Sequence, residues 1–457
     1  MDTIEVDTIA AISTPPGAGA VALIRLSGPG AIRVLARIAP GLGTIESRRV
    51  HLAAIRDPRT GELLDRALVS VHRAPASYTG EDVVEICGHG GWLGPALLME
   101  ACVAAGARAA GAGEFTRRAY LNGRMDLVQA EAVADLIGGR SGAARRAALG
   151  QLDRGLSARI GELRAALIGL EALLVHHLDF PEEDEPPVSL ERIAEEADGV
   201  AARLRALLAT ASEGELLREG ALAVLAGRPN SGKSSLFNAL LGQERAIVTD
   251  LPGTTRDALE VPVSLGGFPF RLVDTAGLRE AADRIEGLGI EVARRFLAAA
   301  DLILLCVEGT RALGADEIGF LGEWSGRAVL VVRTKGDLDD GATGGAQSAD
   351  VGAPTVRVCA LTGQGLDALR DQAARVVYRG LSVESHAPVL TRARHTHAVR
   401  VALEEVEAFA EALRGGVGPE VAAAHLRPAE SALEEMLGAI MPEEVLDRVF
   451  AEFCIGK

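Results

Sequence analysis

The sequence has little positive charge and few aromatic residues. Its 47 Lys and Arg residues are outnumbered by 63 Asp and Glu residues, so the formal net charge is −16. This balance excludes a broad basic groove for nucleic acid, because such a groove needs clustered Lys and Arg side chains. A nucleic-acid ligand would require a local basic patch or a partner subunit. Aromatic residues make up only 3% of the chain and indicate no particular class of protein.

The cysteines are few and widely separated. No two of them form a C-x-x-C pair, which speaks against a disulfide framework and a zinc site; they are Cys87, Cys102, Cys306, Cys359 and Cys454. No apolar run approaches the ~18 residues of a membrane-spanning helix, and the first residues lack the features of a secretory signal. We therefore expect a cytoplasmic protein in a reducing compartment. Cys87 and Cys102 are expected to be buried, and Cys306 to lie in the core.

A phosphate-binding loop lies in the middle of the chain. Residues 227–234 read Gly-Arg-Pro-Asn-Ser-Gly-Lys-Ser, a complete G-x-x-x-x-G-K-[ST] motif. An apolar run of strand length, 221–226, precedes it, and a segment with helical spacing, 235–241, follows it. In such a loop Lys233 contacts the β- and γ-phosphates and Ser234 is a ligand of Mg²⁺. The expected nucleotide contacts here are Asn230, Ser231, Gly232, Lys233, Ser234 and Ser235.

Three later segments indicate a guanine nucleotide. Asp274-Thr-Ala-Gly277 follows an apolar run, and we expect Asp274 to hold the Mg²⁺ shell through water. In Thr334-Lys-Gly-Asp337, the Asp337 carboxylate can accept hydrogen bonds from the base N1 and N2 donors, a pair that adenine lacks. Lys335 would cover the purine ring, and residues 359–361 fit a last base-contacting loop. The expected contacts are Asp274, Thr275, Ala276, Gly277, Thr334, Lys335, Asp337, Cys359, Ala360 and Leu361.

The first position of the base-selecting segment departs from the usual pattern. Most GTPases of this type have Asn where this chain has Thr334. Thr is shorter and lacks the amide, so we expect its bridge to the phosphate loop to be lost or weakened. We expect the site still to prefer guanine but to bind the nucleotide with lower affinity.

The segment 249–257 is expected to sense the γ-phosphate, with Thr255 as a second Mg²⁺ ligand. Many small GTPases orient the attacking water with a Gln just after the Asp-x-x-Gly motif, but that position is Leu278 here. Something else must therefore catalyse hydrolysis. Glu286 is the candidate for orienting the water, and Glu280 and Asp283 are rivals by residue type.

GTP hydrolysis also needs a cation beside the phosphates, because the transition state concentrates negative charge on the phosphoryl oxygens. Asn230 lies inside the phosphate loop, where its amide oxygen can coordinate K⁺ together with Thr254 and backbone carbonyls. The alternative is that Asn230 only caps the backbone of its own loop.

The composition along the chain predicts a multidomain α/β protein. Residues 1–119 have an α+β pattern, residues 120–216 and 381–457 have helical spacing, and residues 217–380 alternate strand-like runs with helices. We expect an α+β N-terminal domain, a split α-helical domain, and an inserted Ras-like, doubly wound α/β GTPase domain. The two helical halves would pair through their apolar stripes; two independent helical linkers are the alternative.

Motifs along the whole chain resemble those of the MnmE (TrmE) family of tRNA-modification GTPases. The carboxyl end reads Phe453-Cys-Ile-Gly-Lys457, which is specific when joined to the other motifs. The amino-terminal motifs are Asp-Thr-Ile-Ala at 7–10, Thr-Pro-Pro-Gly-Ala-Gly-Ala-Val at 14–21, Ile-Arg-Leu-Ser-Gly at 24–28, Tyr-Thr-Gly-Glu-Asp at 78–82, Gly-His-Gly-Gly at 88–91, Gly-Glu-Phe-Thr at 113–116 and Asn-Gly-Arg-Met-Asp-Leu at 122–127.

The resemblance implies a homodimer formed through N-terminal domains that bind 5-formyltetrahydrofolate or a related folate. The implied pterin pocket consists of Arg25, Glu85, Arg124 and Lys457, although the family commonly has Lys at position 124 and Arg differs in donor geometry.

For the nucleotide domain, the resemblance implies K⁺ at Asn230, Thr249, Leu251 (through its carbonyl) and Thr254, and Glu286 as the group that orients the water. It also implies an FAD-dependent partner, MnmG. The pair adds an aminomethyl or carboxymethylaminomethyl group at C5 of the wobble uridine (U34) of certain tRNAs.

Several alternatives remain open at this point. Cys454 is either a nucleophile toward uracil C6 or a packing residue that shapes the folate pocket, and a flavin partner could activate uracil without it. Residues 391–400 are favoured as a solvated helix face over a tRNA contact, and His89 as a turn residue bonded to backbone groups. The whole chain is either a tRNA-modification enzyme or a regulatory GTPase switch, in ribosome assembly or stress signalling, without tRNA chemistry. The terminal motifs favour the enzyme.

Overall fold

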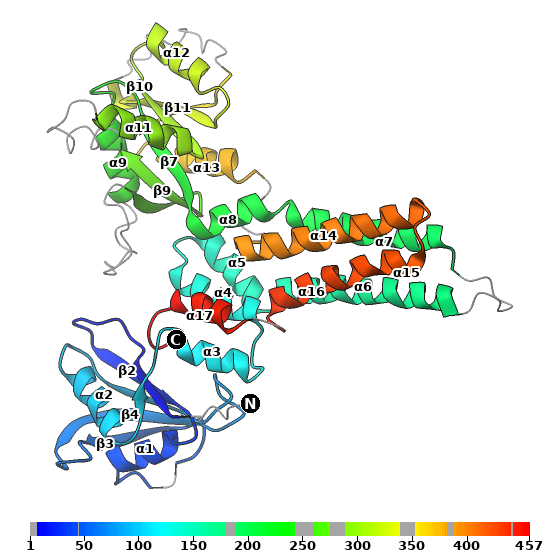
Figure 1. The fold of residues 1–457 in the computed structure, drawn as a ribbon. Coiled ribbons are helices and arrows are strands. Elements are labelled where there is room, and N and C mark those ends of the chain that lie inside the picture. The colour runs from blue at the N-terminus through cyan, green and yellow to red at the C-terminus, as the bar shows by residue number, and fades with distance from the viewer. Residues whose placement is uncertain are drawn as a thin grey trace. The chain divides into compact units, whose positions relative to one another are not determined.

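The computed structural model (Figure 1) describes residues 7–43, 45–179, 188–242, 260–274, 288–338, 352–379, 381, 388–439 and 442–457. The chain divides into two compact units. One comprises Met1–Ala134 with Glu434–Lys457, and the other Asp135–Leu433. The predicted domain boundaries after residues 119, 216 and 380 stay predictions.

The first unit contains a six-stranded sheet in the order β3-β4-β5-β2-β1-β6. Neighbouring strands are antiparallel except for the parallel pair β1 and β6. Residues alternate between the two faces along each strand, and helices α1 and α2 cover one face. The bounds are β1 Ile9–Ile12, β2 Val21–Ser27, α1 Ala31–Ile38, β3 Val50–Arg56, β4 Leu63–His72, β5 Val83–His89, α2 Gly94–Ala104 and β6 Arg108–Ala109.

The core of this sheet lies on the face covered by α1 and α2. Ile24, Val69 and Ile86 point into it, and α1 contributes a stripe at positions 31, 34, 35 and 38. The opposite face carries the neighbouring pair Leu52 and Leu68, exposed at 67% and 49%. Cys87 is paired with Leu68 on that face and is only partly buried, so its expected burial is wrong: the alternation of β5 places Ile86 inward instead.

The carboxyl end of the chain belongs to the first unit and packs there on the helices that follow the sheet. Helix α17 (Glu443–Ala451) contacts α3 (Glu114–Leu121), and Phe450 and Phe453 pack on Leu127 and Ala130 of α4 (Leu127–Gly138). The tail then forms a β-bridge between Ala112 and Ile455. The last residues thereby become part of the N-terminal sheet region.

The second unit contains a six-stranded sheet in the order β12-β11-β10-β7-β9-β8. All pairs are parallel except the antiparallel pair β8 and β9. The bounds are β7 Ala221–Ala226, α9 Lys233–Gly242, β8 Val261–Leu265, β9 Phe268–Asp274, α11 Leu288–Ala299, β10 Leu302–Glu308, α12 Ala315–Glu323, β11 Val329–Thr334, η1 Gly336–Leu338, β12 Thr355–Arg357 and α13 Leu366–Val377.

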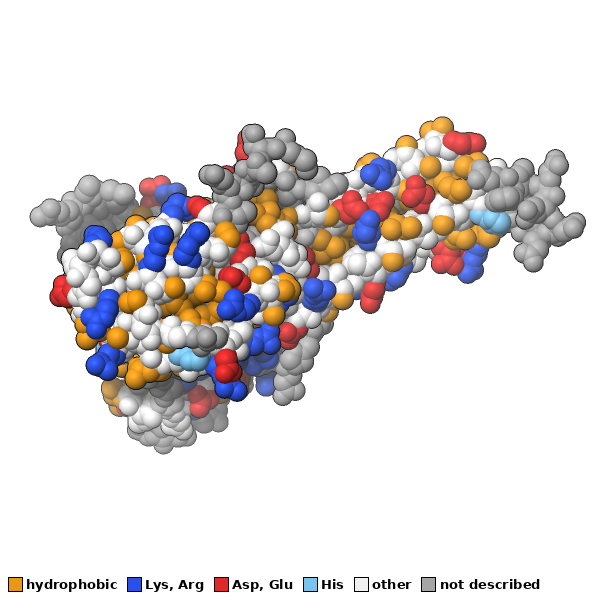
Figure 2. All heavy atoms as spheres, turned by 90° about the horizontal axis from the view of Figure 1, so that it is seen from below, with side chains coloured by type: hydrophobic (Ala, Val, Ile, Leu, Met, Phe, Trp, Pro, Cys, Tyr) orange, Lys and Arg blue, Asp and Glu red, His pale blue; other side chains and the backbone are white. Residues whose placement is uncertain are grey.

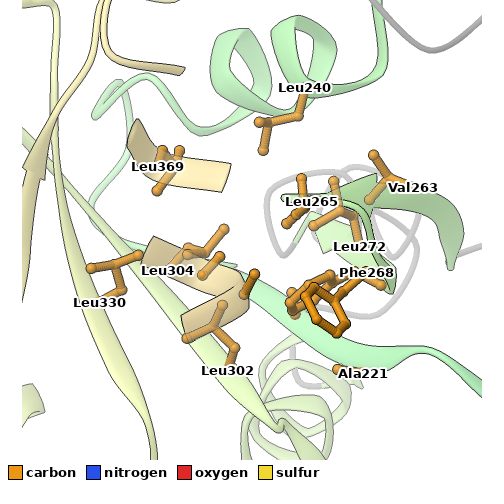
Figure 3. Close-up of a cluster of buried hydrophobic side chains, with 14 of the residues drawn as sticks. Ala221, Leu240, Val263, Leu265, Phe268, Leu272, Leu302, Leu304, Leu330 and Leu369 are labelled. Carbon is orange, nitrogen blue, oxygen red and sulfur yellow. The ribbon is translucent and has the colours of Figure 1, made fainter. Parts of the chain in front are cut away.

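Hydrophobic cores lie on both faces of this sheet. Figure 3 shows one of them, in which Leu304 and Leu330 of the central strands meet Leu240 of α9 and Leu369 of α13. On the other face, the alternate residues of the same strands pack against α11 and α12. This doubly wound arrangement confirms the predicted α/β nucleotide domain and explains its continuous apolar strands.

Helices on either side of the nucleotide domain in the sequence pack together in the same unit (Figure 1). Helix α14 lies along α7, and Arg205 of α7 forms a 2.6 Å ion pair with Glu407 of α14. The predicted split helical domain is therefore confirmed, and the alternative of independent linkers is wrong. The bounds are α5 Gly142–Leu152, α6 Gly155–Asp179, α7 Leu190–Leu208, α8 Ala211–Glu219, α14 Ala393–Arg414, α15 Pro419–Ala422, η2 Ala423–His425 and α16 Leu426–Leu437.

The outer surface of these helices is strongly charged. Figure 2 shows Asp and Glu side chains next to Lys and Arg side chains along the helices at its right. The ion pairs of these helices include an exposed one within α7, Arg192 with Glu196 at 2.7 Å, and a more buried one between α6 and α16, Arg164 with Glu430 at 3.1 Å. Within the described part of the chain, no helix has the length and apolar character needed to cross a membrane.

Candidate functional site

The phosphate loop joins the buried strand β7 to helix α9, as its sequence context predicts. Gly227 has a φ of +140°, and a Cβ there would lie 2.4 Å from the carbonyl oxygen of Cys306 on β10. Only glycine fits such a close approach. Asn230 has a φ of +63°, a left-handed conformation that Asn tolerates better than most residues. The loop backbone is therefore fixed by residue type at both places.

Lys233 and Ser234 begin α9 and lie where the motif requires them. The Lys233 side chain is largely buried, and its Nζ donates hydrogen bonds to the carbonyl oxygens of Gly227 (3.1 Å) and Arg228 (2.8 Å). The ammonium group thus lies across the loop that would surround the phosphates. Ser234 Oγ donates to Asp274 Oδ2 at 2.9 Å. Two predicted members of the Mg²⁺ site, from α9 and from the end of β9, are therefore neighbours.

Thr334 bridges the base-selecting segment and the phosphate loop. Its side chain is buried, and Oγ1 donates to the carbonyl oxygen of Ser231 at 2.7 Å, with the carbonyl oxygen of Val307 at 3.3 Å. The expected loss of this bridge is therefore wrong, and its expected weakness relative to a bridge made by Asn stays a prediction. The hydroxyl reaches because the two segments approach closely: a Cβ at Gly232 would lie 3.2 Å from Thr334 Cβ.

The base-selecting residues come from two neighbouring loops. Asp337 lies in η1, and its Oδ1 accepts a hydrogen bond from the thiol of Cys359 at 3.1 Å. Lys335 has a φ of +56°, and its ammonium lies 2.5 Å from Glu308 Oε1. That contact lowers the pKa of Glu308 below its usual value. Leu361 is 86% exposed. The structure thus brings Asp337 and Cys359 together, although they are far apart in the sequence.

The remaining predicted nucleotide residues divide into two groups. Ser235 is exposed on α9, and Ala360 is partly buried beside Cys359. The residues of the two switch segments lie outside the described residues, and the predictions for them stay predictions: Thr249, Leu251, Thr254, Thr255, Thr275, Ala276, Gly277 and Glu286.

Arg228, in the phosphate loop, makes contacts that the sequence interpretation did not anticipate. Its guanidinium contacts Asp316 Oδ2 at 2.6 Å and Glu317 Oε1 at 3.1 Å, both at the start of α12. Glu317 is nearly buried, also pairs with Arg311 at 2.6 Å and accepts from the Gly314 N–H. The hydrogen bond from Arg311 is the main reason why the pKa of Glu317 lies below its usual value. No motif reveals this contact, because the second position of the phosphate loop accepts any residue.

A second polar site lies on the N-terminal sheet. Arg25 of β2 and Glu85 of β5 are directly opposite in the sheet register, and the guanidinium donates to Glu85 Oε1 from Nε (3.0 Å) and Nη2 (2.8 Å). The guanidinium carbon also lies 5.6 Å from the ring centre of Tyr78 and 5.9 Å from that of Phe115. Both distances are within the range of cation–π contacts. The pair is mostly shielded from solvent, with side-chain exposures of 13% and 28%.

The carboxyl-terminal tail reaches the same pair. The carbonyl oxygen of Gly456 accepts hydrogen bonds from Ser13 Oγ (3.1 Å) and Arg25 Nη1 (3.5 Å), and the Lys457 carbonyl accepts one from the Phe115 N–H. Burial, and then the charge of Arg25, lowers the pKa of Lys457. Cys454 lies in this tail and is exposed. The structure therefore gathers Arg25, Glu85 and the tail, from both ends of the chain.

Arg124 is placed differently from the other predicted members of this pocket. It is exposed in the segment after α3, and within the described residues no hydrogen bond joins it to Arg25 or Glu85. Its side chain lies beside Gly80: a Cβ there would be 3.4 Å from Arg124 Cγ. Its role in ligand binding stays a prediction.

Two further expectations about polar residues are corrected. The basic stretch 391–400 is only partly the solvated helix face that was expected: Ala393, His397 and Arg400 are exposed. Arg392 and His395 are buried instead, and Arg392 forms a 2.7 Å ion pair with Asp135. His89 is bonded through Nδ1 to the Asp65 carboxylate at 2.7 Å rather than to backbone groups. In both cases a distant acidic side chain supplies the partner.

Comparison with known proteins gives matches along the whole chain. The family profile described as "GTP-binding protein TrmE N-terminus" matches residues 8–124, and the "MnmE helical domain" profile matches residues 127–454. A crystal structure of the G domain of the T. maritima FeoB iron transporter is 26% identical, covering 34% of this chain and 98% of that chain, with a TM-score of 0.26.

Full-length relatives are each named "tRNA modification GTPase MnmE". The protein of Moorella thermoacetica is 44% identical over 461 residues, 99% of both chains. That of Syntrophotalea carbinolica is 42% identical over 99% of both chains, and that of Aquifex aeolicus is 40% identical over 99% of this chain and 100% of its own. With this similarity from end to end and a phosphate loop assembled as described, the chain belongs to the MnmE (TrmE) family of tRNA modification GTPases.

Proposed function

We propose that this protein is a K⁺-dependent GTPase that acts with an FAD-dependent MnmG-type partner. Together they form the aminomethyl or carboxymethylaminomethyl group at C5 of U34 in certain tRNAs. The observation that carries the proposal is the presence in one chain of a phosphate loop and of the Arg25–Glu85 pair completed by the terminal tail. A purely regulatory switch has no evident need for the second site.

The nucleotide site fits a magnesium nucleotide. Mg²⁺ prefers oxygen ligands, and Ser234 Oγ lies 2.9 Å from the Asp274 carboxylate. In the proposal, Ser234 and Thr255 are Mg²⁺ ligands, and Asp274 acts through water. Lys233, already directed across the loop, stabilises the phosphate charge.

The K⁺ ion would be held by Asn230, Thr249, Thr254 and the carbonyl of Leu251. The ion would supply positive charge beside the phosphates, the role that an arginine has in other GTPases. The left-handed Asn230 supports this proposal because Asn is one of the few residues that occupy such a position while offering a side-chain oxygen. Glu286 is proposed to orient the attacking water.

The N-terminal site fits a folate in its chemistry. A carboxylate such as Glu85 accepts hydrogen bonds from the N–H groups of a pterin, and Arg25 and Lys457 offer cationic donors to its oxygens. The folate would supply a one-carbon unit to the reaction. Arg25 is held rigidly by Glu85, Tyr78 and Phe115, which prepares the site for a planar ligand.

A homodimer through the N-terminal domains is supported by the open face of their sheet. Leu52 and Leu68 are paired across β3 and β4 and are exposed, and Val50 next to them is 65% exposed. Grouped apolar side chains of this kind mark contact surfaces for other chains.

The test is the nucleoside composition of bulk tRNA, measured by mass spectrometry in cells without this protein and in cells rescued with wild type or Cys454→Ser. Loss of C5-substituted wobble uridine, restored by wild type, supports the proposal. The serine variant shows whether the exposed thiol is needed or whether the partner activates the uracil alone. An unchanged nucleoside profile in the deletion strain would overturn the proposal in favour of a regulatory GTPase.

A further inference from the structure

The hydroxyl of Thr334 is the only polar group of its side chain, and it has one proton. A hydroxyl can donate a single hydrogen bond. The two carbonyl oxygens within reach belong to Ser231, at 2.7 Å, and Val307, at 3.3 Å. The shorter contact takes the proton, so the hydroxyl is directed into the phosphate loop.

This hydrogen bond joins three parts of the nucleotide site. Thr334 is the last residue of β11, Ser231 lies in the phosphate loop, and Val307 is in β10. Thr334 is only 3% exposed. A buried carbonyl that loses a donor carries a desolvation cost. The hydroxyl therefore contributes to holding the loop in position relative to the base-selecting residues.

The same geometry limits what residue 334 can read on the base. Guanine presents acceptors, N7 and O6, on one edge and the N1 and N2 donors on the other. An Asn amide has two N–H donors and could serve a loop carbonyl and a base acceptor at once. Thr334 has no second donor. In this chain the N1 and N2 edge remains readable by Asp337.

We propose that Thr334 is a positioning residue: it fixes the phosphate loop through Ser231 and gives no hydrogen bond to guanine N7. This inference rests on the proposed role of residues 334–337 in base binding. It predicts a nucleotide site that discriminates guanine from adenine but is indifferent to the atom at position 7 of the purine.

The experiment compares GDP with 7-deaza-GDP, in which a C–H group replaces N7, on the full-length protein. Affinities are measured for wild type, Thr334→Ser, Thr334→Val and Thr334→Asn. Wild type and Thr334→Ser are expected to bind both nucleotides equally. Thr334→Val keeps the shape without the hydroxyl and is expected to lose about tenfold in affinity for both nucleotides, whereas Thr334→Ser, which keeps the hydroxyl, is expected to retain the affinity of the wild type. Thr334→Asn is expected to gain a preference for GDP, because its amide has a second N–H.

Three outcomes would overturn the inference. One is Thr334→Val with wild-type affinity, which would show that the bridge does not position the loop. Another is a wild type that binds 7-deaza-GDP markedly more weakly than GDP. The third is Thr334→Asn without any preference, which would place residue 334 away from N7. The readout is nucleotide binding, so it is independent of tRNA modification, K⁺ and folate.

Discussion

The thiol of Cys359 donates a hydrogen bond to Asp337 Oδ1 at 3.1 Å. The two residues lie on neighbouring loops, and Cys359 is only 2% exposed. This thiol therefore fixes one oxygen of the carboxylate that is proposed to read guanine.

Replacing Cys359 tests that contact. Cys359→Ala removes the donor and is expected to weaken GDP binding by roughly three- to tenfold, because one hydrogen bond contributes about 0.5–1.5 kcal/mol. Cys359→Ser keeps a donor and is expected to stay within about threefold of wild type. Titration of a fluorescent GDP analogue measures both variants. Equal losses in both would mean that the thiol acts by its volume and not by donating to Asp337.

Hydrolysis of GTP is expected to be faster in K⁺ than in Na⁺, by roughly tenfold or more if the ion stabilises transition-state charge. Asn230→Lys is expected to remove the difference, because its ammonium replaces the ion. Asn230→Gly is the matched control: it keeps the left-handed backbone of +63° and loses only the amide. Rates are measured by phosphate release at equal ionic strength. Identical rates of the wild type in both salts would contradict a role for K⁺.

The docked tail is expected to depend on Gly456. Its φ is +93°, and a Cβ there would lie 2.8 Å from the carbonyl oxygen of Ile12. Gly456→Ala is therefore expected to displace the tail and to weaken binding of 5-formyltetrahydrofolate at least about tenfold, measured by calorimetry, with GTP hydrolysis unchanged.

The control for that variant is Gly61→Ala. Gly61 also has a positive φ, +76°, but a Cβ there meets no atom within 4 Å. Gly61→Ala therefore has the same backbone strain as Gly456→Ala, about 1 kcal/mol, but not its steric clash. If both variants lose folate affinity equally, general destabilisation of the domain, and not the tail, is the cause.

Lowering the pH is expected to reduce the stability of the nucleotide domain, because Glu317 becomes protonated. Arg311, the main cause, lowers the folded-state pKa of Glu317 below the ordinary 4.5. A carboxyl group whose pKa is lower in the folded state than in the unfolded state stabilises the fold at pH values above the unfolded-state pKa. This stabilisation is lost as the pH falls through the folded-state pKa. Glu317→Gln is expected to cost about 1–3 kcal/mol at neutral pH and to flatten the decline below pH 4.5.

The measurement is thermal unfolding of the full chain as a function of pH. The transition that GDP shifts upward identifies the nucleotide domain, because a ligand stabilises only the unit that it binds. Parallel declines of wild type and Glu317→Gln in acid would assign the pH dependence to other carboxylates.

The sequence alone identified the phosphate loop because its motif is local. The phosphate loop, its strand and its helix are contiguous, and the loop's own sequence places glycine at 227 and Asn at 230, two positions with a positive φ. The alternation of apolar runs also sufficed for the doubly wound sheet, since strands buried on both faces have a distinctive composition.

Only the tertiary structure decided the contacts between residues far apart in the chain. Sequence patterns do not show that Gly456 meets Ser13, 443 residues away, or that Arg392 is buried against Asp135. The same holds for Thr334, where a shorter side chain keeps its bridge because Gly232 allows the loop to approach. Such contacts form or fail when the distance between two backbone segments changes by a few tenths of an ångström. The packing of the whole fold sets these distances, and local residue type does not.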